Sequence, residues 1–190
     1  MGRWEPDSRG RLQEAALALY SERGFDQTTA AQIAAQAGLT ERTFFRHFAD
    51  KREVLFGGSA ALQERIVAGV VGAPAGAGPL DAVARGLDAA AAMLGEFRRD
   101  LSRQRQAVID ANPELREREL AKLADYAAAV AVALRDRGVS EAQATLASEA
   151  GMTVLRVALQ EWTSGGDDDR DLAVIMRHSV AELRAVTAGG

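Results

Sequence analysis

Residues 28–51 constrain the fold of this chain more than any other stretch of its sequence. Two short runs with helical spacing of apolar residues lie here, and Gly38 separates them. Gly38 supplies a tight turn, Leu39 is apolar and fits beneath it, and Ala34 is small where the two helices would cross. Thr40 is a favoured N-cap for the second helix. This pattern predicts a helix-turn-helix, a motif whose second helix enters the DNA major groove with its N-terminal residues.

The rest of the chain also has helical periodicity. The first helix carries apolar residues at i, i+3 and i+4 spacing from Leu12 to Tyr20 and ends at Gly24. A fourth helix is expected from about Asp50 through Ile66. Later helices are expected at about 80–96, 100–111, 114–137, 140–163 and 169–187. No strand-like alternation or hairpin signal occurs, so the sequence predicts an all-α fold.

The aromatic residues divide the chain into two regions. Seven of the ten lie in the first 57 positions, which suits a compact domain that builds its core from few residues. The remainder is rich in Ala, Leu and Val, which suits helices packed side by side. We therefore expect a three-helix DNA-binding domain over residues 1–56 and a larger helical bundle over residues 57–190.

Composition and missing motifs argue against several classes of function. The chain of 190 residues has no cysteine, two histidines and a net charge of −4. His47 falls in the helix-turn-helix, and neither it nor His178 has a catalytic partner at motif spacing. The acidic run at residues 167–169 is expected to be a solvated loop with no metal. We expect no enzyme activity, cofactor or bound metal.

The same composition sets expectations for location and partners. No run of about 18 apolar residues is visible, and the N-terminus is charged, so we expect a soluble cytoplasmic protein without a membrane partner. The acidic net charge gives no general attraction to nucleic acid. Residues 40–52, however, contain four basic and only two acidic residues, so a DNA contact would come from this local basic patch.

A family resemblance follows from residue types at fixed spacing without gaps. They are Gly24-Phe25, Thr28-Thr29, Ile33-Ala34, Ala37-Gly38-Leu39, Thr43 through Phe48, and Lys51. This run, over about residues 8–56, resembles the DNA-binding domain of TetR-family transcriptional regulators. The remaining chain is similar to the family in length and helical pattern.

The resemblance implies a role for each matched residue. Thr28 and Thr29 would bind a phosphate, and Glu41, Arg42 and Thr43 would face base edges. His47 and Lys51 would contact the DNA backbone. The full DNA-contact set is Thr28, Thr29, Thr40, Glu41, Arg42, Thr43, Phe45, Arg46, His47 and Lys51.

Other roles remain open for some of these residues. Phe45 stands where the family usually has tyrosine, so it lacks the hydroxyl that reaches a phosphate and supplies only packing or an apolar contact such as one to a thymine methyl. His47 could be a core histidine, and Arg42 could bind a phosphate instead of a base. Glu41 could simply favour the N-terminus of its helix.

The resemblance also implies a dimer. In the family the last two helices, here about 140–163 and 169–187, form a four-helix interface. Ala147, Ala150, Gly151 and Ala158 would allow close helix approach, although packing within one chain would give the same pattern. A two-fold dimer would require a near-palindromic operator.

The resemblance further implies that the remaining helices enclose an effector pocket. Its candidate lining residues are Met93, Phe97, Gln104, Tyr126, Met152 and Arg156. Because aromatic residues are few after residue 57, a small or aliphatic effector is favoured. The resemblance thus implies a repressor released from its operator by a ligand, with repression taken from the family because nothing in the residues encodes it. The alternative is a helical dimer that acts as a protein-interaction module and binds DNA only incidentally.

Overall fold

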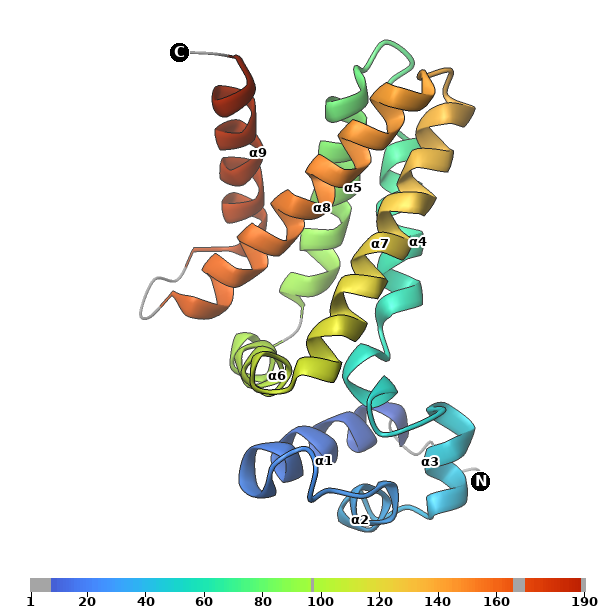
Figure 1. Cartoon of the computed structure of the whole chain (residues 1–190), viewed down its shortest axis with the longest axis vertical. Coiled ribbons are helices and arrows are strands. Elements are labelled where there is room, and N and C mark those ends of the chain that lie inside the picture. Colours follow the sequence, from blue (N-terminus) through green and yellow to red (C-terminus); the bar gives the residue numbers. More distant parts are fainter. Residues whose placement is uncertain (1–7, 97, 166–169, 189–190) are drawn as a thin grey trace, which may run out of the picture. The chain divides into compact units, whose positions relative to one another are not determined.

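The computed structural model describes residues 8–96, 98–165 and 170–188, and these form nine α-helices, one short 3₁₀ helix and no strand (Figure 1). The all-α fold is confirmed. The elements are α1 (Ser8–Arg23), α2 (Ala30–Gln36), α3 (Glu41–His47), η1 (Glu53–Phe56), α4 (Ser59–Val71), α5 (Pro79–Gly95), α6 (Arg99–Ala111), α7 (Pro113–Asp136), α8 (Glu141–Ser164) and α9 (Leu172–Ala188).

The chain divides into two compact units. The first contains residues 1–58 together with 103–119, and the second contains residues 59–102 and 120–190. The divisions fall within α6 and within α7. The domain boundary at residue 56 stays a prediction, and the helical segment 103–119 is an addition to the first unit that sequence patterns did not indicate.

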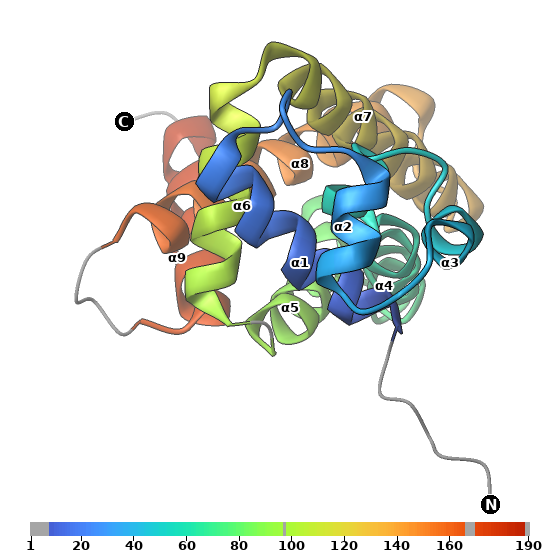
Figure 2. The same cartoon turned by 90° about the horizontal axis from the view of Figure 1, so that it is seen from below.

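The first unit buries the apolar stripe of α1 as the periodicity predicts. Leu12, Ala16 and Tyr20 are all buried, and Phe44 and Phe48 complete the core around α3. Figure 2 shows α1, α2 and α3 from below. The arrangement α1–α2–α3 is the three-helix domain expected from the sequence.

One predicted helix is broken in the structure. Instead of a single helix from about Asp50, the chain forms η1, passes Gly57 and Gly58, and begins α4 at Ser59. Glycine costs about 1 kcal/mol relative to alanine inside a helix, and two in succession favour an interruption. Asp50 also starts a turn, because its Oδ1 accepts the backbone N–H groups of Arg52 and Glu53 at 2.8 and 3.1 Å.

The second unit has one core to which α4, α5, α7, α8 and α9 all contribute. α4 and α5 form an antiparallel pair joined by the loop at residues 72–78 (Figure 1). Their backbones meet at two glycines. A Cβ atom on Gly69 would lie 2.7 Å from Gly86 Cα, and one on Gly86 would lie 2.7 Å from the Ile66 carbonyl oxygen. The absence of side chains at these two positions therefore sets the distance between the helices.

Among the described residues, the segment Glu53–Val71 is long and apolar enough to cross a membrane by length and composition alone, with 28% of it buried. A single segment of this kind is weak evidence for a membrane span, since core helices of other proteins meet the same criterion.

We predict that Gly86→Ala destabilises the protein. The added methyl must push α4 and α5 apart, and overpacking of this kind costs about 1–3 kcal/mol, which exceeds the gain of about 1 kcal/mol in helix propensity. Gly95→Ala, at the end of the same helix and without a close neighbour, is the control and should be neutral or slightly stabilising. Urea unfolding of the three proteins measures this; equal stability of both variants would contradict it.

Candidate nucleic-acid interface

The turn between α2 and α3 has the geometry of a helix-turn-helix. Gly38 has a φ of +65°, a backbone conformation that residues with a side chain rarely adopt. Around it, the Leu39 N–H donates to the Ala34 carbonyl at 2.8 Å, which closes the end of α2. The Arg11 guanidinium of α1 also donates to the Ala37 carbonyl. The direction in which α3 leaves the turn is therefore fixed.

Both short helices begin at threonine caps. The Thr29 hydroxyl accepts the Gln32 N–H at 3.2 Å while the Gln32 side chain accepts the Thr29 N–H at 2.9 Å, a reciprocal capping box. The Thr40 hydroxyl accepts the Thr43 N–H at 3.2 Å. Both threonines are exposed, so their hydroxyls stand at the two helix N-termini on the surface.

The residues of α3 separate into a buried and an exposed set. Phe44 is fully buried, whereas Glu41, Arg42, Phe45 and Arg46 are exposed and Thr43 is half-buried. Four of these residues frame a surface hollow of about 470 Å³: Arg42, Thr43, Phe45 and Arg46. Two arginines and an aromatic residue thus line one hollow on the outer face of a short helix.

Phe45 is an unusual surface residue. Its side chain is 53% exposed and its ring meets that of Phe44 edge to face, with 5.2 Å between the centroids. The contact with Phe44 holds the ring on one side and leaves the other free for an apolar partner. The predicted apolar contact to DNA remains a prediction, and the exposure of the ring is compatible with it.

Thr28 is placed differently from Thr29. It is buried, its hydroxyl donates to the Gly24 carbonyl at 2.9 Å, and its N–H donates to the Phe25 carbonyl at 3.2 Å. Both of its donors therefore bond to carbonyls of the loop that follows α1. Of the two threonines predicted to bind a phosphate, only Thr29 presents its hydroxyl at the surface.

His47 is the last residue of α3, and Lys51 lies in the loop that follows. His47 is half-buried, and its Nε2 atom is buried without a hydrogen-bond partner. The Lys51 ammonium donates to the Phe25 carbonyl at 2.8 Å and to the Thr28 carbonyl at 3.2 Å. These positions leave the predicted backbone contacts of both residues untested.

The charged loop after α3 is held by Asp50. Its carboxylate accepts hydrogen bonds from the Arg52 guanidinium at 2.7 and 3.1 Å and from two backbone amides. Partial burial alone would raise the pKa of Asp50, but the Arg52 side chain and the Glu53 and Arg52 amides together hold it below its ordinary value. The carboxylate is therefore ionised at neutral pH, and it orders the residues that follow Lys51.

Contacts from the segment 103–119 also reach this loop. Arg105 Nε donates to the Leu55 carbonyl at 2.7 Å, and its guanidinium lies 5.2 Å from the centroid of the Phe56 ring. Arg118 forms an ion pair with Glu53. Sequence reasoning missed both arginines, because nothing in their local pattern signals a partner some fifty or more positions away.

The candidate effector residues differ in burial and do not all belong to the same unit. Tyr126 and Met152 belong to the core of the second unit, Met93 is half-buried and Arg156 is exposed. Gln104 is exposed and belongs to the first unit, and Phe97 lies outside the described residues.

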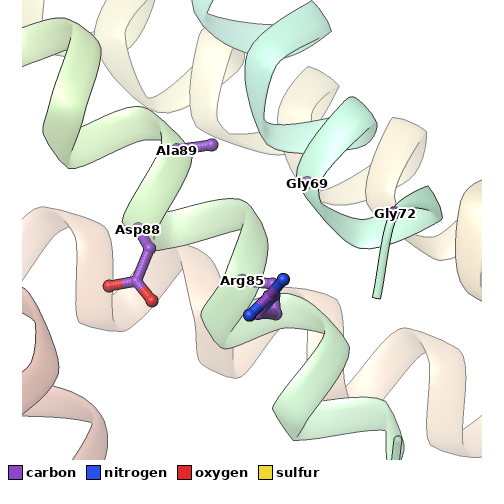
Figure 3. Close-up of a pocket in the computed structure, with 5 residues that line it drawn as sticks. All are labelled: Gly69, Gly72, Arg85, Asp88 and Ala89. Atoms are coloured by element: carbon purple, nitrogen blue, oxygen red, sulfur yellow. The ribbon is translucent and has the colours of Figure 1, made fainter. Parts of the chain in front are cut away.

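A shallow hollow of about 320 Å³ lies between α4 and α5 (Figure 3). Gly69 of α4 and Gly72, the first residue of the following loop, line it opposite Arg85, Asp88 and Ala89 of α5. None of the described effector candidates lines this hollow. Within the described ranges, no group of three or more His, Asp or Glu side chains is placed to hold a metal ion.

The small residues of α8 face the interior of the second unit. Ala147, Gly151 and Ala158 are buried, and a Cβ atom on Gly151 would lie 2.4 Å from Val83 of α5. These residues therefore serve packing within the chain. A separate stripe of α8 is left uncovered, in which Leu146 is 72% exposed and Val157 is 42% exposed.

The geometry defines a helical protein with a surface-exposed helix-turn-helix, and comparisons with known proteins agree. The model for bacterial regulatory proteins of the tetR family matches residues 12–56. HTH-type transcriptional regulator TcmR from Streptomyces glaucescens is 38% identical over 103 residues, which are 54% of this chain and 41% of TcmR. The chain thus spans less than half the length of this curated relative.

Solved structures share the fold over almost the whole chain. A TetR-family transcriptional regulator from Mesorhizobium loti MAFF303099 is 23% identical, with 98% of each chain covered and a TM-score of 0.58. The transcriptional regulator FadR from Bacillus subtilis is 19% identical, with 92% of this chain and 96% of FadR covered and a TM-score of 0.62. Residues 12–56 thus resemble the N-terminal domain of TetR-family regulators, and the chain as a whole shares the fold of these solved structures.

We predict that Asp50→Asn destabilises the protein at neutral pH but not in acid. A carboxylate whose pKa is lower in the folded than in the unfolded state adds stability above its unfolded pKa, and this stability is lost as the pH falls through the folded value. The difference between wild type and variant should therefore shrink below about pH 4. Urea unfolding across this pH range measures it, and a difference that stays constant into acid would refute the role of the charge.

Proposed function

We propose that this chain is a sequence-specific DNA-binding regulator of transcription, and that it acts as a homodimer on a near-palindromic operator. The observation that carries the proposal is α3, which presents two arginines and an aromatic ring to solvent at the end of a fixed turn. The match of residues 12–56 to the tetR-family model and the similarity to TcmR support the same function.

Each exposed side chain of α3 has a chemistry suited to DNA. An arginine at the position of Arg42 can donate two hydrogen bonds to a guanine in the major groove. Thr43 and Glu41 lie beside it on the first turn and would face neighbouring bases. Thr29, Thr40, Arg46 and His47 would bind phosphates, which fix register without selecting sequence, and Phe45 would contact a thymine methyl.

We predict that Arg42→Ala weakens operator binding and relaxes base preference. Loss of a bidentate arginine–guanine contact costs about 1–3 kcal/mol per site, so affinity should fall about 5- to 150-fold for each half-site. Arg65→Ala, which removes an exposed arginine of α4, is the matched control and should leave affinity unchanged.

Fluorescence anisotropy measures both variants against a duplex enriched by the wild-type protein from a randomised pool, with a scrambled duplex beside it. Saturable wild-type binding to the enriched duplex alone supports a regulator. Equal binding of wild type to both duplexes, or none to either, would contradict sequence-specific recognition and favour a helical protein-interaction module.

The dimer proposal rests on uncovered apolar stripes. Leu146, Ala150, Thr153 and Val157 share one face of α8, and no other part of the described chain covers Leu146 or Val157 fully. α9 exposes Val174, 46% exposed, on its own outer face. A second copy that packs its own α8 and α9 against these stripes would bury both and set two recognition helices about one DNA turn apart.

We predict that Val157→Glu converts a dimer into a monomer, because a carboxylate on the stripe would be buried without a partner. Leu120→Glu, at a more exposed apolar position of α7, is the control and should remain dimeric. Size-exclusion chromatography with light scattering measures the mass. A monomeric wild type, or a dimeric Val157→Glu variant, would refute this interface.

The direction of control and the effector are further parts of the proposal. We propose repression in the cytoplasm, with release from DNA when a small or aliphatic ligand binds the second unit. Bacillus subtilis FadR, which shares the fold, has been solved in complex with stearoyl-CoA. A ligand acts in this way only if it binds the DNA-free conformation more tightly than the DNA-bound one.

A further inference from the structure

Lys51 has an environment that differs from that of an ordinary surface lysine. Its Nζ atom donates to the carbonyl oxygens of Phe25 at 2.8 Å, Thr28 at 3.2 Å and Asp26 at 3.5 Å. The same atom lies 4.2 Å from the centroid of the Phe25 ring. An ammonium has three N–H donors, and here three carbonyls and an aromatic face surround it. The Lys51 ammonium thus binds groups of the protein itself.

The backbone of Lys51 is held as well. The Tyr20 hydroxyl of α1 donates to the Lys51 carbonyl at 2.6 Å, and the Tyr20 ring packs against Phe25 with 5.2 Å between the centroids. Tyr20 is buried. Both ends of Lys51 are therefore tied to α1 and to the loop that follows it.

These contacts join the two ends of the helix-turn-helix. Phe25 and Thr28 lie in the loop before α2, and Lys51 lies in the loop after α3. The bond from Lys51 to Phe25 closes a segment that contains both helices and the turn between them. The Thr28 carbonyl bound by Lys51 directly precedes Thr29, whose side chain caps α2.

We propose that Lys51 is a positioning residue for DNA recognition. Its hydrogen bonds tie the loop after α3 to the loop before α2, a link that we call the lock, and so set the orientation of α2 and α3. This inference rests on the proposed DNA-binding function and changes how Lys51 contributes to it: the ammonium acts on protein carbonyls and not on a phosphate.

The identity of the residue matters to this role. Of the 23 basic residues in the chain only Lys51 and Lys122 are lysines. A compact ammonium directs its three donors to converging carbonyls, whereas a planar guanidinium directs its donors in one plane and is longer. At a phosphate, by contrast, arginine binds at least as well as lysine. Lys51→Arg therefore separates the two roles, since it keeps the charge and disrupts the lock.

The experiment compares Lys51→Arg and Lys51→Met with wild type, by anisotropy on the duplex that the wild-type protein enriches, across a series of salt concentrations and well below the unfolding temperature. Loss of hydrogen bonds to a charged group costs about 10- to 100-fold in an equilibrium constant, and we expect both variants to lose affinity on that scale. We expect the slope of affinity against salt to stay at the wild-type value.

Arg46→Met is the comparison variant, because it removes an exposed positive charge of α3. A lost phosphate contact lowers the salt slope by about 0.9 per protomer, and this is the result expected for Arg46 alone. The inference is overturned if Lys51→Arg binds like wild type, or if Lys51→Met lowers the slope as Arg46→Met does. It is also overturned if both Lys51 variants are less stable yet bind with wild-type affinity.

A measurement without DNA keeps this inference separate from the proposed function. Hydrogen exchange of the free protein should show faster exchange of the Thr28 and Gln32 amides in both Lys51 variants, because these amides bond within the loop and cap that Lys51 holds. Unchanged exchange would refute the lock. If the wild-type protein enriches no duplex, the DNA-binding proposal fails while the exchange result still decides whether the lock exists.

Discussion

The burial of Phe44 is the interaction on which the candidate DNA-binding surface depends. α3 has seven residues, and helices this short do not persist alone in water because their nucleation is unfavourable. Phe44 is completely buried, Phe48 closes the end of the helix, and Thr40 caps its start. The exposed residues of α3 keep their positions because the buried ones are fixed. One face of this short helix is thus buried in the core, and the opposite face carries the candidate DNA contacts.

Much of this arrangement could be predicted from the sequence because it is local. The stripe from Leu12 to Tyr20, the cap at Thr40 and the turn at Gly38 depend on neighbours within a few positions, and all are found where the pattern places them. The break between η1 and α4 is local too, and the adjacent glycines at 57 and 58 were its signal.

What could not be predicted depends on partners distant in sequence. Thr28 and Thr29 are adjacent and chemically identical, yet one hydroxyl turns inward to a carbonyl and the other caps α2 at the surface. Lys51 has the spacing of a phosphate contact, but its ammonium is surrounded by carbonyls from the loop before α2. A motif fixes residue type at a position, while tertiary packing decides which way the side chain points.

The two apolar faces of α8 also have roles that the sequence pattern cannot predict. Gly151 packs against α5 and Ala158 is buried, while Leu146 and Val157 are exposed. A helical pattern alone cannot say which face meets the chain and which meets a partner. Helix packing decides it, because the absence of a side chain at Gly151 permits the close contact with Val83, while Leu146 and Val157 stay at the surface. A surface left uncovered by the chain's own packing is therefore the structural basis for placing a second copy there.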